Sequence, residues 1–320
     1  MRDGKYLVET RGLCKTFKAS GGGLLHALED VDLGIGRGRT LGVVGESGCG
    51  KSTLGRCVLR LQEPSSGDVL FGGESILKYR RRRMKELHRD MQMIFQDPYG
   101  CLDPRMPVFE LIAEPLRELS SRRISPRELE ERVLDIMEQC GLPRRCAESY
   151  PHELDGGRRQ RVGLARAMVV DPKFIVCDEP VSALDVSIQA QILNLLMDMQ
   201  ERRGLTYMFI THDLCVVRHI SDEIIVMYMG QVVEQAGRDE LFKNPLHPYT
   251  QALLSAIPTT DLSRRGRPRQ LLAGEVSSPV DPPPGCRFAP RCPLAGPDCA
   301  GDCALRELSP GHLCRCVRQG

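Results

Sequence analysis

The chain has 320 residues, of which 41% are hydrophobic and 27% charged, a composition that fits a globular protein and argues against general disorder. Its 44 basic and 42 acidic side chains leave a formal net charge of +2, which gives no electrostatic reason to expect nucleic acid as a partner. No apolar run approaches the roughly 20 residues that span a bilayer, and the N-terminus lacks the apolar core of a signal peptide. We therefore expect a cytoplasmic chain that reaches a membrane only by docking on another protein.

The first ninety-odd residues are expected to form strands and turns that lead into one helix. Strand-like segments cover residues 7–17 and 25–35, and a third strand at 40–44 precedes a glycine loop and a helix that starts near Ser52. The basic run Arg80–Arg83 is interpreted as a solvated loop rather than a nucleic-acid patch. A further strand is expected at 91–97.

Helical periodicity runs from Val108 to about Gly141, with Ser125 as an N-cap, Pro126 at the first helical position and Gly141 as a stop. From Lys173 onward, strands and helices alternate. The predicted strands cover residues 174–180 and 206–213, and a strand pair is predicted over residues 223–235. The predicted helices cover residues 187–204 and 214–221. This alternation predicts an α/β fold with a mostly parallel sheet that is covered on both faces.

Residues 45–52 read GESGCGKS and fit the phosphate-loop pattern G-x-x-x-x-G-K-[ST], between a predicted strand and a predicted helix. In such a loop, backbone N–H groups at a helix N-terminus surround phosphate oxygens. Lys51 is expected to reach the β- and γ-phosphates of ATP, and the Ser52 hydroxyl to ligate Mg²⁺. The predicted ATP contacts in this region are Gly45, Glu46, Ser47, Gly48, Cys49, Gly50, Lys51, Ser52 and Thr53.

The apolar strand that begins at Phe174 ends in two acids, Asp178 and Glu179. Carboxylate oxygens are the ligands that hard cations prefer, so Asp178 is expected to hold Mg²⁺ through its water shell. Glu179 is expected to act as the base that orients and polarises the attacking water.

The order and spacing of these motifs resemble the ABC ATPases over about residues 5–257. The resemblance implies that Gln96 belongs to the glutamine loop, which senses Mg²⁺ and contacts a transmembrane partner, that His212 is the switch histidine at the γ-phosphate, and that Phe17 stacks on adenine. Lys51, Glu179 and His212 would then be the catalytic residues. The family signature falls on Leu154, Asp155, Gly156, Gly157 and Arg158, and the D-loop on Ser182, Ala183, Leu184 and Asp185.

The implied fold is a phosphate-loop ABC ATPase over residues 1–240, with a mostly parallel core sheet, an antiparallel N-terminal β subdomain and a helical subdomain at about 97–170. Residues 241–320 would form a small C-terminal extension. Residues 183–196, 204–214, 216–234 and 244–258 are similar to the dipeptide/oligopeptide/nickel importer branch of the family. This implies an ATPase that energises import of peptides, nickel or a metal chelate, at the cytoplasmic face of the membrane.

In that branch two ATPase subunits lie beneath two transmembrane permease subunits, which are fed by an extracytoplasmic substrate-binding protein. The two ATPases close head to tail, so that each ATP lies between the phosphate loop of one subunit and the signature of the other. The transported substrate is selected by the other subunits. A non-transport accessory ATPase, such as that of the C–P lyase system, is the alternative. A DNA-repair or chromosome-organising ATPase is disfavoured, because too few residues separate Gly50 from Leu154 for a long coiled coil.

The signature departs from the family pattern at Asp155, where the family has a serine that donates a hydrogen bond to the γ-phosphate across the dimer. An ionised aspartate accepts hydrogen bonds but donates none. It would also face phosphate charge, at a cost of roughly 4 kcal/mol for unit charges about 4 Å apart at an effective dielectric near 20. Asp155 could instead serve only as a helix cap. The departure suggests a heterodimer in which the ATP site on this chain's Lys51 hydrolyses and the opposite site turns over slowly.

Six of the 14 cysteines lie between residues 286 and 316, where the surrounding segments resemble the tail of the same branch. The resemblance implies that Cys286, Cys292, Cys299 and Cys316 hold a [4Fe–4S] cluster, with Cys303 and Cys314 left over. Four thiolates also suit tetrahedral zinc, and free or packing cysteines remain a third interpretation. The spacings differ from the C-x₂-C pairs usual in zinc sites, which favours the cluster.

Overall fold

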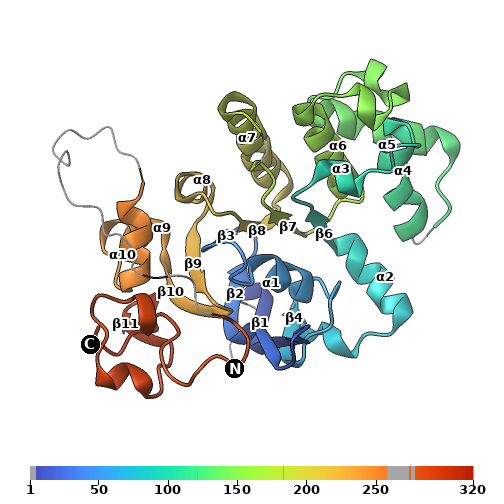
Figure 1. Ribbon diagram of the computed structural model, residues 1–320. Coiled ribbons are helices and arrows are strands. Elements are labelled where there is room, and N and C mark those ends of the chain that lie inside the picture. Colours follow the sequence, from blue (N-terminus) through green and yellow to red (C-terminus); the bar gives the residue numbers. More distant parts are fainter. Residues whose placement is uncertain (1–4, 121, 183, 258–273, 275–277, 320) are drawn as a thin grey trace. The chain divides into compact units, whose positions relative to one another are not determined.

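The computed structural model describes residues 5–120, 122–182, 184–257, 274 and 278–319, and the chain divides into two compact units (Figure 1). The first unit consists mainly of residues 70–210, with short stretches from the first forty residues. The second unit combines residues 9–34, 40–69 and 211–320. Each unit is described by itself below.

The first unit is built around three short parallel strands in the order β6-β7-β8. These are β6 (Met91–Ile94), β7 (Phe174–Asp178) and β8 (Thr206–Ile210), and every residue of β7 and β8 is buried. Burial on both faces agrees with their uninterrupted apolar sequences. The α-helices of this unit are α2 (Arg81–Asp90), α3 (Pro98–Cys101), α4 (Val108–Leu119), α5 (Pro126–Gln139), α6 (Gly156–Met168) and α7 (Val186–Arg203). It also contains the two-residue strand β5 (Glu74–Ser75) and the 3-10 turns η1 (Ile76–Lys78), η2 (Arg144–Glu148) and η3 (Pro151–Glu153).

Helix α5 begins and ends as its sequence predicts. The Ser125 hydroxyl accepts the Glu128 backbone N–H at 3.2 Å, and Pro126 is the first helical residue. Such a cap satisfies one of the backbone donors that a helix start leaves without a partner. Just beyond the helix end, Gly141 adopts a left-handed conformation (φ 68°), which glycine adopts at little cost.

The interpretation of Arg80–Arg83 as a loop is wrong, because helix α2 begins at Arg81. The four arginines are nevertheless exposed, as expected. Helix α2 buries Leu87, while its arginines remain in water. The run of four like charges concealed this weak amphipathic pattern.

The second unit contains most of the N-terminal antiparallel sheet, which includes β1 (Tyr6–Lys18), β2 (Leu24–Gly36) and β4 (Ser66–Phe71). It also contains β3 (Thr40–Val44), which pairs in parallel with β9 (Glu223–Tyr228), and β9 continues antiparallel into β10 (Gln231–Gly237). The α-helices of this unit are α1 (Lys51–Val58), α8 (Leu214–Ile220), α9 (Arg238–Lys243) and α10 (Pro248–Ser255).

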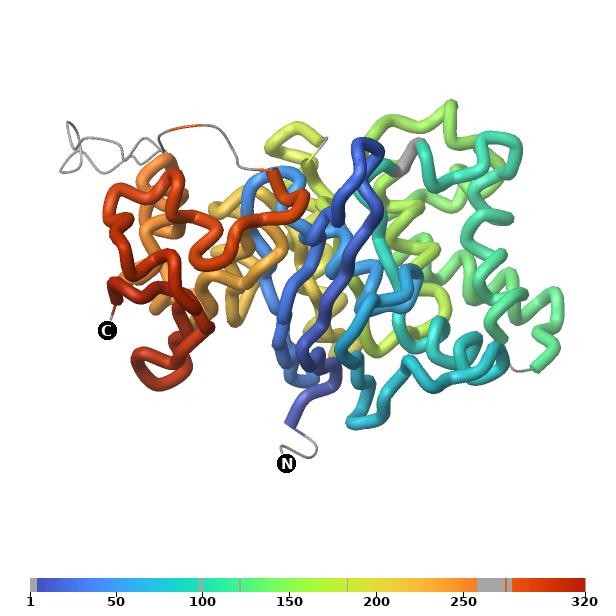
Figure 2. Tube along the Cα trace, turned by 60° about the horizontal axis from the view of Figure 1, so that its bottom comes forward, coloured from blue at the N-terminus to red at the C-terminus, as the bar shows by residue number. Residues whose placement is uncertain are grey.

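The C-terminal residues of the second unit are joined to β10 by strand pairing. Strand β12 (His312–Cys314) pairs antiparallel with β10, so that Glu234 lies opposite Cys314, and β11 (Arg306–Ser309) pairs with β12. The 3-10 turns η5 (Ala289–Arg291) and η6 (Pro297–Ala300) precede this hairpin. Figures 1 and 2 show this red segment beside α10.

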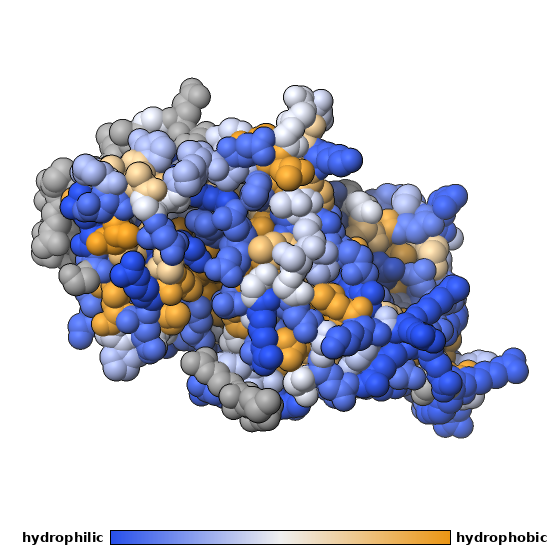
Figure 3. Space-filling model, turned by 90° about the horizontal axis from the view of Figure 1, so that it is seen from below, coloured by the Kyte–Doolittle hydropathy of each residue, from blue (hydrophilic) through white to orange (hydrophobic). Residues whose placement is uncertain are grey.

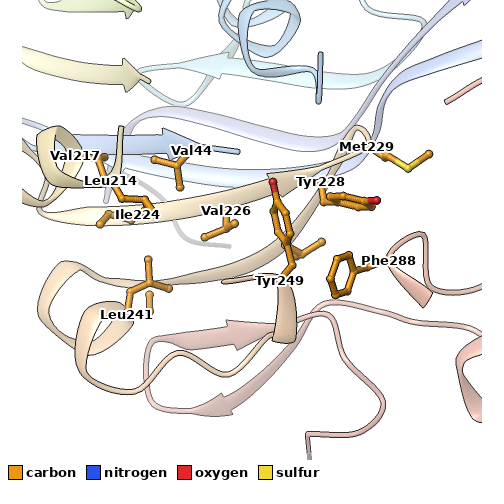
Figure 4. Close-up of a cluster of buried hydrophobic side chains, with 12 residues drawn as sticks. Val44, Leu214, Val217, Ile224, Val226, Tyr228, Met229, Leu241, Tyr249 and Phe288 are labelled. Atoms are coloured by element: carbon orange, nitrogen blue, oxygen red, sulfur yellow. The ribbon is translucent and has the colours of Figure 1, made fainter. Parts of the chain in front are cut away.

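A cluster of buried side chains joins the C-terminal residues to the strands β3, β9 and β10 (Figure 4). Tyr228, Tyr249 and Phe288 lie at one end of it with their rings facing one another, with centroids 4.8–5.4 Å apart and edge-to-face or tilted planes. Such aromatic pairs contribute about 0.5–1.5 kcal/mol each beyond the area they bury. The first part of the C-terminal extension therefore packs as part of the core of its unit.

Among the described residues, no helix combines the length and apolar character that crossing a bilayer requires. On the face shown in Figure 3, hydrophilic residues predominate and hydrophobic residues occur in separate small groups.

Candidate ATP site

The phosphate loop, residues 45–52, follows β3, and its last two residues, Lys51 and Ser52, begin α1, as its motif requires. Gly48 and Gly50 have φ angles of 79° and 104°, in the region that side chains disfavour. A Cβ added to Gly50 would collide with the Ala27 carbonyl oxygen on β2. Gly50 caps α1 without a side chain, so backbone N–H groups form the N-terminus of the helix, where an anion is favoured.

Lys51 is only 5% exposed, and its ammonium group donates to the carbonyl oxygens of Gly45 and Glu46 at 2.8 and 2.9 Å. A buried cation needs such acceptors to offset its desolvation. The ammonium group therefore lies inside the loop, directed at the backbone that would surround a phosphate. Burial raises the pKa of the neighbouring Cys49 thiol, which therefore stays protonated and poorly nucleophilic.

The other predicted ATP contacts of the second unit lie at strand and helix ends. The predicted adenine-stacking residue, Phe17, is half-buried near the end of β1, with the Lys15 ammonium nitrogen 4.9 Å from its ring centre. His212 is exposed in the turn between β8 and α8. Its neighbour Asp213 caps α8 by accepting the Cys215 N–H at 2.7 Å, which fixes the course of this turn.

In the first unit, Gln96 and Glu179 come together although they are far apart in the sequence. The amide nitrogen of Gln96, just after β6, donates to a carboxylate oxygen of Glu179 at 3.1 Å. Asp178 is 2% exposed at the end of β7. Adjacent parallel strands end at the same edge of a sheet, which explains why β6 and β7 deliver these side chains together.

Glu179 has a φ angle of 46°, which is unusual for a residue with a side chain and costs about 1–3 kcal/mol. Two hydrogen bonds hold it there. Its N–H donates to the Ile210 carbonyl at 2.9 Å, and its own carbonyl accepts from the Ser182 hydroxyl at 3.2 Å. A strained residue fixed by its neighbours is a feature found at functional sites.

The signature segment leads into α6, and Asp155 caps that helix, the role that the alternative interpretation gave it. Its carboxylate accepts the Arg158 N–H at 2.7 Å, and the Arg158 guanidinium lies 3.5 Å from its other oxygen. Leu154 is buried, whereas the Asp155 side chain is 63% exposed. A Cβ on Gly157 would press on Ile188 of α7, so glycine there permits close packing of α6 and α7.

The D-loop residues precede α7. Asp185 caps this helix by accepting the backbone N–H groups of Ser187 and Ile188 at 3.1 and 3.0 Å. The hydrogen bond from the Ser187 hydroxyl, followed by those from the backbone, lowers the pKa of the Asp185 carboxyl group. Ser182 and Leu184 lie in the turn between Glu179 and Asp185, and Ala183 lies outside the described residues.

Two C-terminal residues contact the phosphate loop, which the sequence analysis missed. The Glu46 N–H donates to the Tyr249 hydroxyl at 2.9 Å, and the Glu46 carboxylate pairs with Arg291 at 2.8 and 3.2 Å. The hydrogen bonds with Glu46 raise the pKa of Arg291 further above its usual range. Contacts across 203 and 245 positions leave no periodic signal in the sequence.

The tail cysteines lie in one neighbourhood. Burial raises the pKa of Cys292, and the nearby Cys286 and Cys299 add to this rise. Burial likewise raises the pKa of Cys316, with contributions from Cys286 and Cys292. A hydrogen bond with Cys303, followed by burial, raises the pKa of Cys286 to about 12. Among the described residues, no three or more His, Cys, Asp or Glu side chains are arranged to hold a single metal ion.

The chain is similar to known families over most of its length. Residues 28–182 match the ABC transporter family, and residues 233–299 match the C-terminal region of oligopeptide/dipeptide transporters. The oligopeptide transport ATP-binding protein OppF of Salmonella typhimurium is 49% identical, with 92% of this chain and 88% of that protein aligned. A putative peptide import ATP-binding protein of Brucella ovis is 48% identical over 98% of both chains.

Solved ATP-binding cassettes share the fold. A dimeric cassette in a post-hydrolysis state, bound to ADP and phosphate, aligns with a TM-score of 0.67 and 30% identity over 72% of this chain and 98% of that one. The fold and the phosphate loop define an ATP-hydrolysing ABC cassette. The chain belongs to the ATP-binding subunits of ABC transporters, in the branch that carries the oligopeptide/dipeptide C-terminal region. These findings confirm the predicted family and fold.

Proposed function

We propose that this chain hydrolyses ATP to energise the import of peptides, and that it works on two permease subunits at the cytoplasmic face of the membrane, fed by a substrate-binding protein. The observation that carries the proposal is the complete phosphate loop in a chain that matches peptide-import ATP-binding proteins almost from end to end. The C-terminal region match covers residues beyond an ATPase core. The accessory-ATPase alternative has no support in the comparisons.

We further propose the following roles in ATP hydrolysis. The ligands present suit Mg²⁺, because Ser52, Gln96 and Asp178 offer hydroxyl, amide and carboxylate oxygens. Bound Mg²⁺ would supply positive charge that neutralises the phosphate oxygens. Lys51 and the N–H groups of residues 45–53, apart from the Glu46 N–H that Tyr249 accepts, bind the phosphates. Phe17 stacks on adenine, His212 contacts the γ-phosphate, and Glu179 takes a proton from the attacking water. Residues 1–240 would form the ATPase domain and 241–320 its extension.

Reconstitution tests the proposed transport directly. In proteoliposomes that contain this chain, its partner ATPase and their permease subunits, we expect uptake of labelled peptides that depends on ATP and on the binding protein. Lys51→Ala should abolish uptake, because it removes the cation that binds the phosphates. Uptake of nickel or a metal chelate in place of peptides would contradict the peptide assignment and leave the ATPase assignment standing.

We also propose that the second ATPase subunit differs from this one. Asp155 already accepts the Arg158 N–H, and its acceptor-only carboxylate replaces a donor at the position that serves the partner's ATP. A homodimer would carry this defect at both sites. In a heterodimer the site on this chain's Lys51 receives a signature from its partner, so one competent site remains.

We propose that Cys286, Cys292, Cys299 and Cys316 bind a [4Fe–4S] cluster. The four thiols belong to one small segment, in which the Cys286 N–H donates to the Cys299 carbonyl at 2.8 Å, but among the described residues no three of them are arranged around a single metal ion. The proposal therefore rests on the family resemblance and requires the thiols to move together. The pKa values of Cys286, Cys292 and Cys316 are raised, so these thiols would release protons when the cluster binds. Protein purified without oxygen should be brown, with iron and sulfide in equal amounts, and replacing Cys299 by Ser should remove the colour. A colourless protein that contains zinc, or no metal, would contradict the cluster.

A further inference from the structure

The seven residues from Cys286 to Cys292 form an arm, here called the arginine arm, that carries two buried arginines toward the phosphate loop. Arg287 and Arg291 are 6% and 9% exposed. Buried guanidinium groups need partners, since each carries five N–H donors and a permanent charge. The partners of these two arginines identify the part of the chain that the arm supports.

Arg291 pairs with the phosphate loop itself. Its two terminal nitrogens contact the two carboxylate oxygens of Glu46 at 2.8 and 3.2 Å, in the two-pronged geometry that gives Arg–carboxylate pairs their strength. Glu46 is the second residue of the loop, where a free carboxylate would repel the phosphates of a nucleotide. Pairing with Arg291 offsets that charge and fixes the side chain against the arginine arm.

Tyr249 fixes the backbone at the same residue. Its hydroxyl accepts the Glu46 N–H at 2.9 Å, while its ring is fully buried. Figure 4 shows the ring beside those of Tyr228 and Phe288, and Phe288 is itself part of the arginine arm. The packing that positions Tyr249 therefore also positions the arm.

Arg287 supports the phosphate loop near Cys49, and it does so through the turn that joins β9 to β10. Its guanidinium contacts the Met229 carbonyl oxygen and the Glu29 carboxylate. The next residue, Gly230, donates its N–H to the Cys49 carbonyl at 2.9 Å. The loop is thus held at Glu46 by Arg291 and Tyr249, and at Cys49 by the turn that Arg287 contacts.

We propose that Arg287, Arg291 and Tyr249 are positioning residues for ATP binding, so that the C-terminal region sets the affinity of the phosphate loop for nucleoside triphosphates. The inference rests on the proposed role of residues 45–53 as the ATP-binding loop. A merely structural arm would anchor the C-terminal region and leave nucleotide affinity unchanged. If the arm positions the loop, loss of Arg291 weakens ATP binding and removal of the Glu46 charge restores it. If the arm is only structural, ATP affinity stays the same in both variants.

The test is a double-mutant cycle at Glu46 and Arg291 in the full-length chain, in which the affinity for ATP is measured. Arg291→Gln leaves the Glu46 carboxylate without its cation, so we expect ATP to bind about tenfold more weakly, a change of about 1.4 kcal/mol. Glu46→Gln combined with Arg291→Gln removes the unpaired charge and should restore affinity to within about threefold. In the assembled transporter, Arg291→Gln should raise KM and leave kcat within about twofold. Titration with a fluorescent ATP analogue measures the affinities.

The control is Arg318→Gln, which removes the exposed tail pair with Asp298 and should not change ATP affinity. Arg291→Lys keeps the charge without the two-pronged geometry and should fall between wild type and Arg291→Gln, which keeps the test usable if the glutamine variant unfolds. Unchanged affinity in Arg291→Gln, or no recovery in the double variant, would overturn the inference. Failure of the wild-type chain to bind ATP would instead defeat the proposed function.

Discussion

Replacing Glu179 by glutamine is expected to lower steady-state ATP turnover of the assembled transporter by at least about 100-fold, the range expected for loss of a general base. The change is isosteric and keeps an oxygen that can accept the Gln96 amide N–H, a bond now 3.1 Å long. Glutamine cannot take a proton, so we expect ATP to bind normally but to persist unhydrolysed. Release of phosphate and retention of radiolabelled ATP measure the two effects.

The same substitution tests the proposed asymmetry. If the working site is built on this chain, the equivalent change in the partner ATPase should reduce turnover by less than about twofold. Glu201→Gln, at an exposed position of α7, is the control and should behave as wild type.

Asp155→Ser keeps a good helix cap and supplies a hydrogen-bond donor, so it should add ATP turnover at the opposite site. Survival of most activity in Glu179→Gln would refute both the assigned base and the asymmetry.

Replacing Glu234 by alanine should destabilise the second unit by about 3–5 kcal/mol, the cost of breaking a buried, hydrogen-bonded charge. Glu234 is fully buried on β10 and accepts the backbone N–H groups of Leu246 and His247 at 2.7 and 2.9 Å, and its carboxylate lies 2.7 Å from His312 Nε2 on β12. Alanine would leave these groups buried without partners. Chemical denaturation measures the loss.

Glu307→Gln provides the matched control. Glu307 also accepts a backbone N–H, that of Gly311 at 2.8 Å, but it is exposed, so the change should stay within about 0.5 kcal/mol. An equally small effect of Glu234→Ala would mean that water or a rearranged β10–β12 pair replaces the lost acceptor. It would show that the network is not needed to hold the C-terminal hairpin.

The sequence was sufficient wherever a local pattern decides the structure. The apolar run ending in Asp178 became a buried strand, and Ser125 with Pro126 began a helix, because burial and capping act over a few residues. The phosphate loop was readable because its glycines satisfy local backbone geometry. The interpretation of Arg80–Arg83 as a loop was wrong because the four charges indicate only exposure to water. Leu87, the buried residue of this helix, was too weak a signal to indicate helical periodicity.

Contacts that join distant positions could not be predicted in this way. Nothing around Arg291 indicates that its partner is Glu46, since the pairing depends on how α10, the arginine arm and β9 pack around one aromatic cluster. The hydrogen bond between Gln96 and Glu179 was likewise not predicted, because the two residues lie 83 positions apart in the sequence. Tertiary packing of this kind carries information that periodicity and spacing do not contain.

The arginine arm begins at Cys286 and ends at Cys292, so two thiols bound the segment that the proposal assigns to nucleotide affinity. Binding equilibria that share one segment are linked in both directions by the same factor. Any modification of these sulfurs that favours ATP must itself be favoured by ATP. A reversible modification of the two thiols that changes ATP affinity tenfold would therefore have its own equilibrium shifted tenfold by saturating ATP.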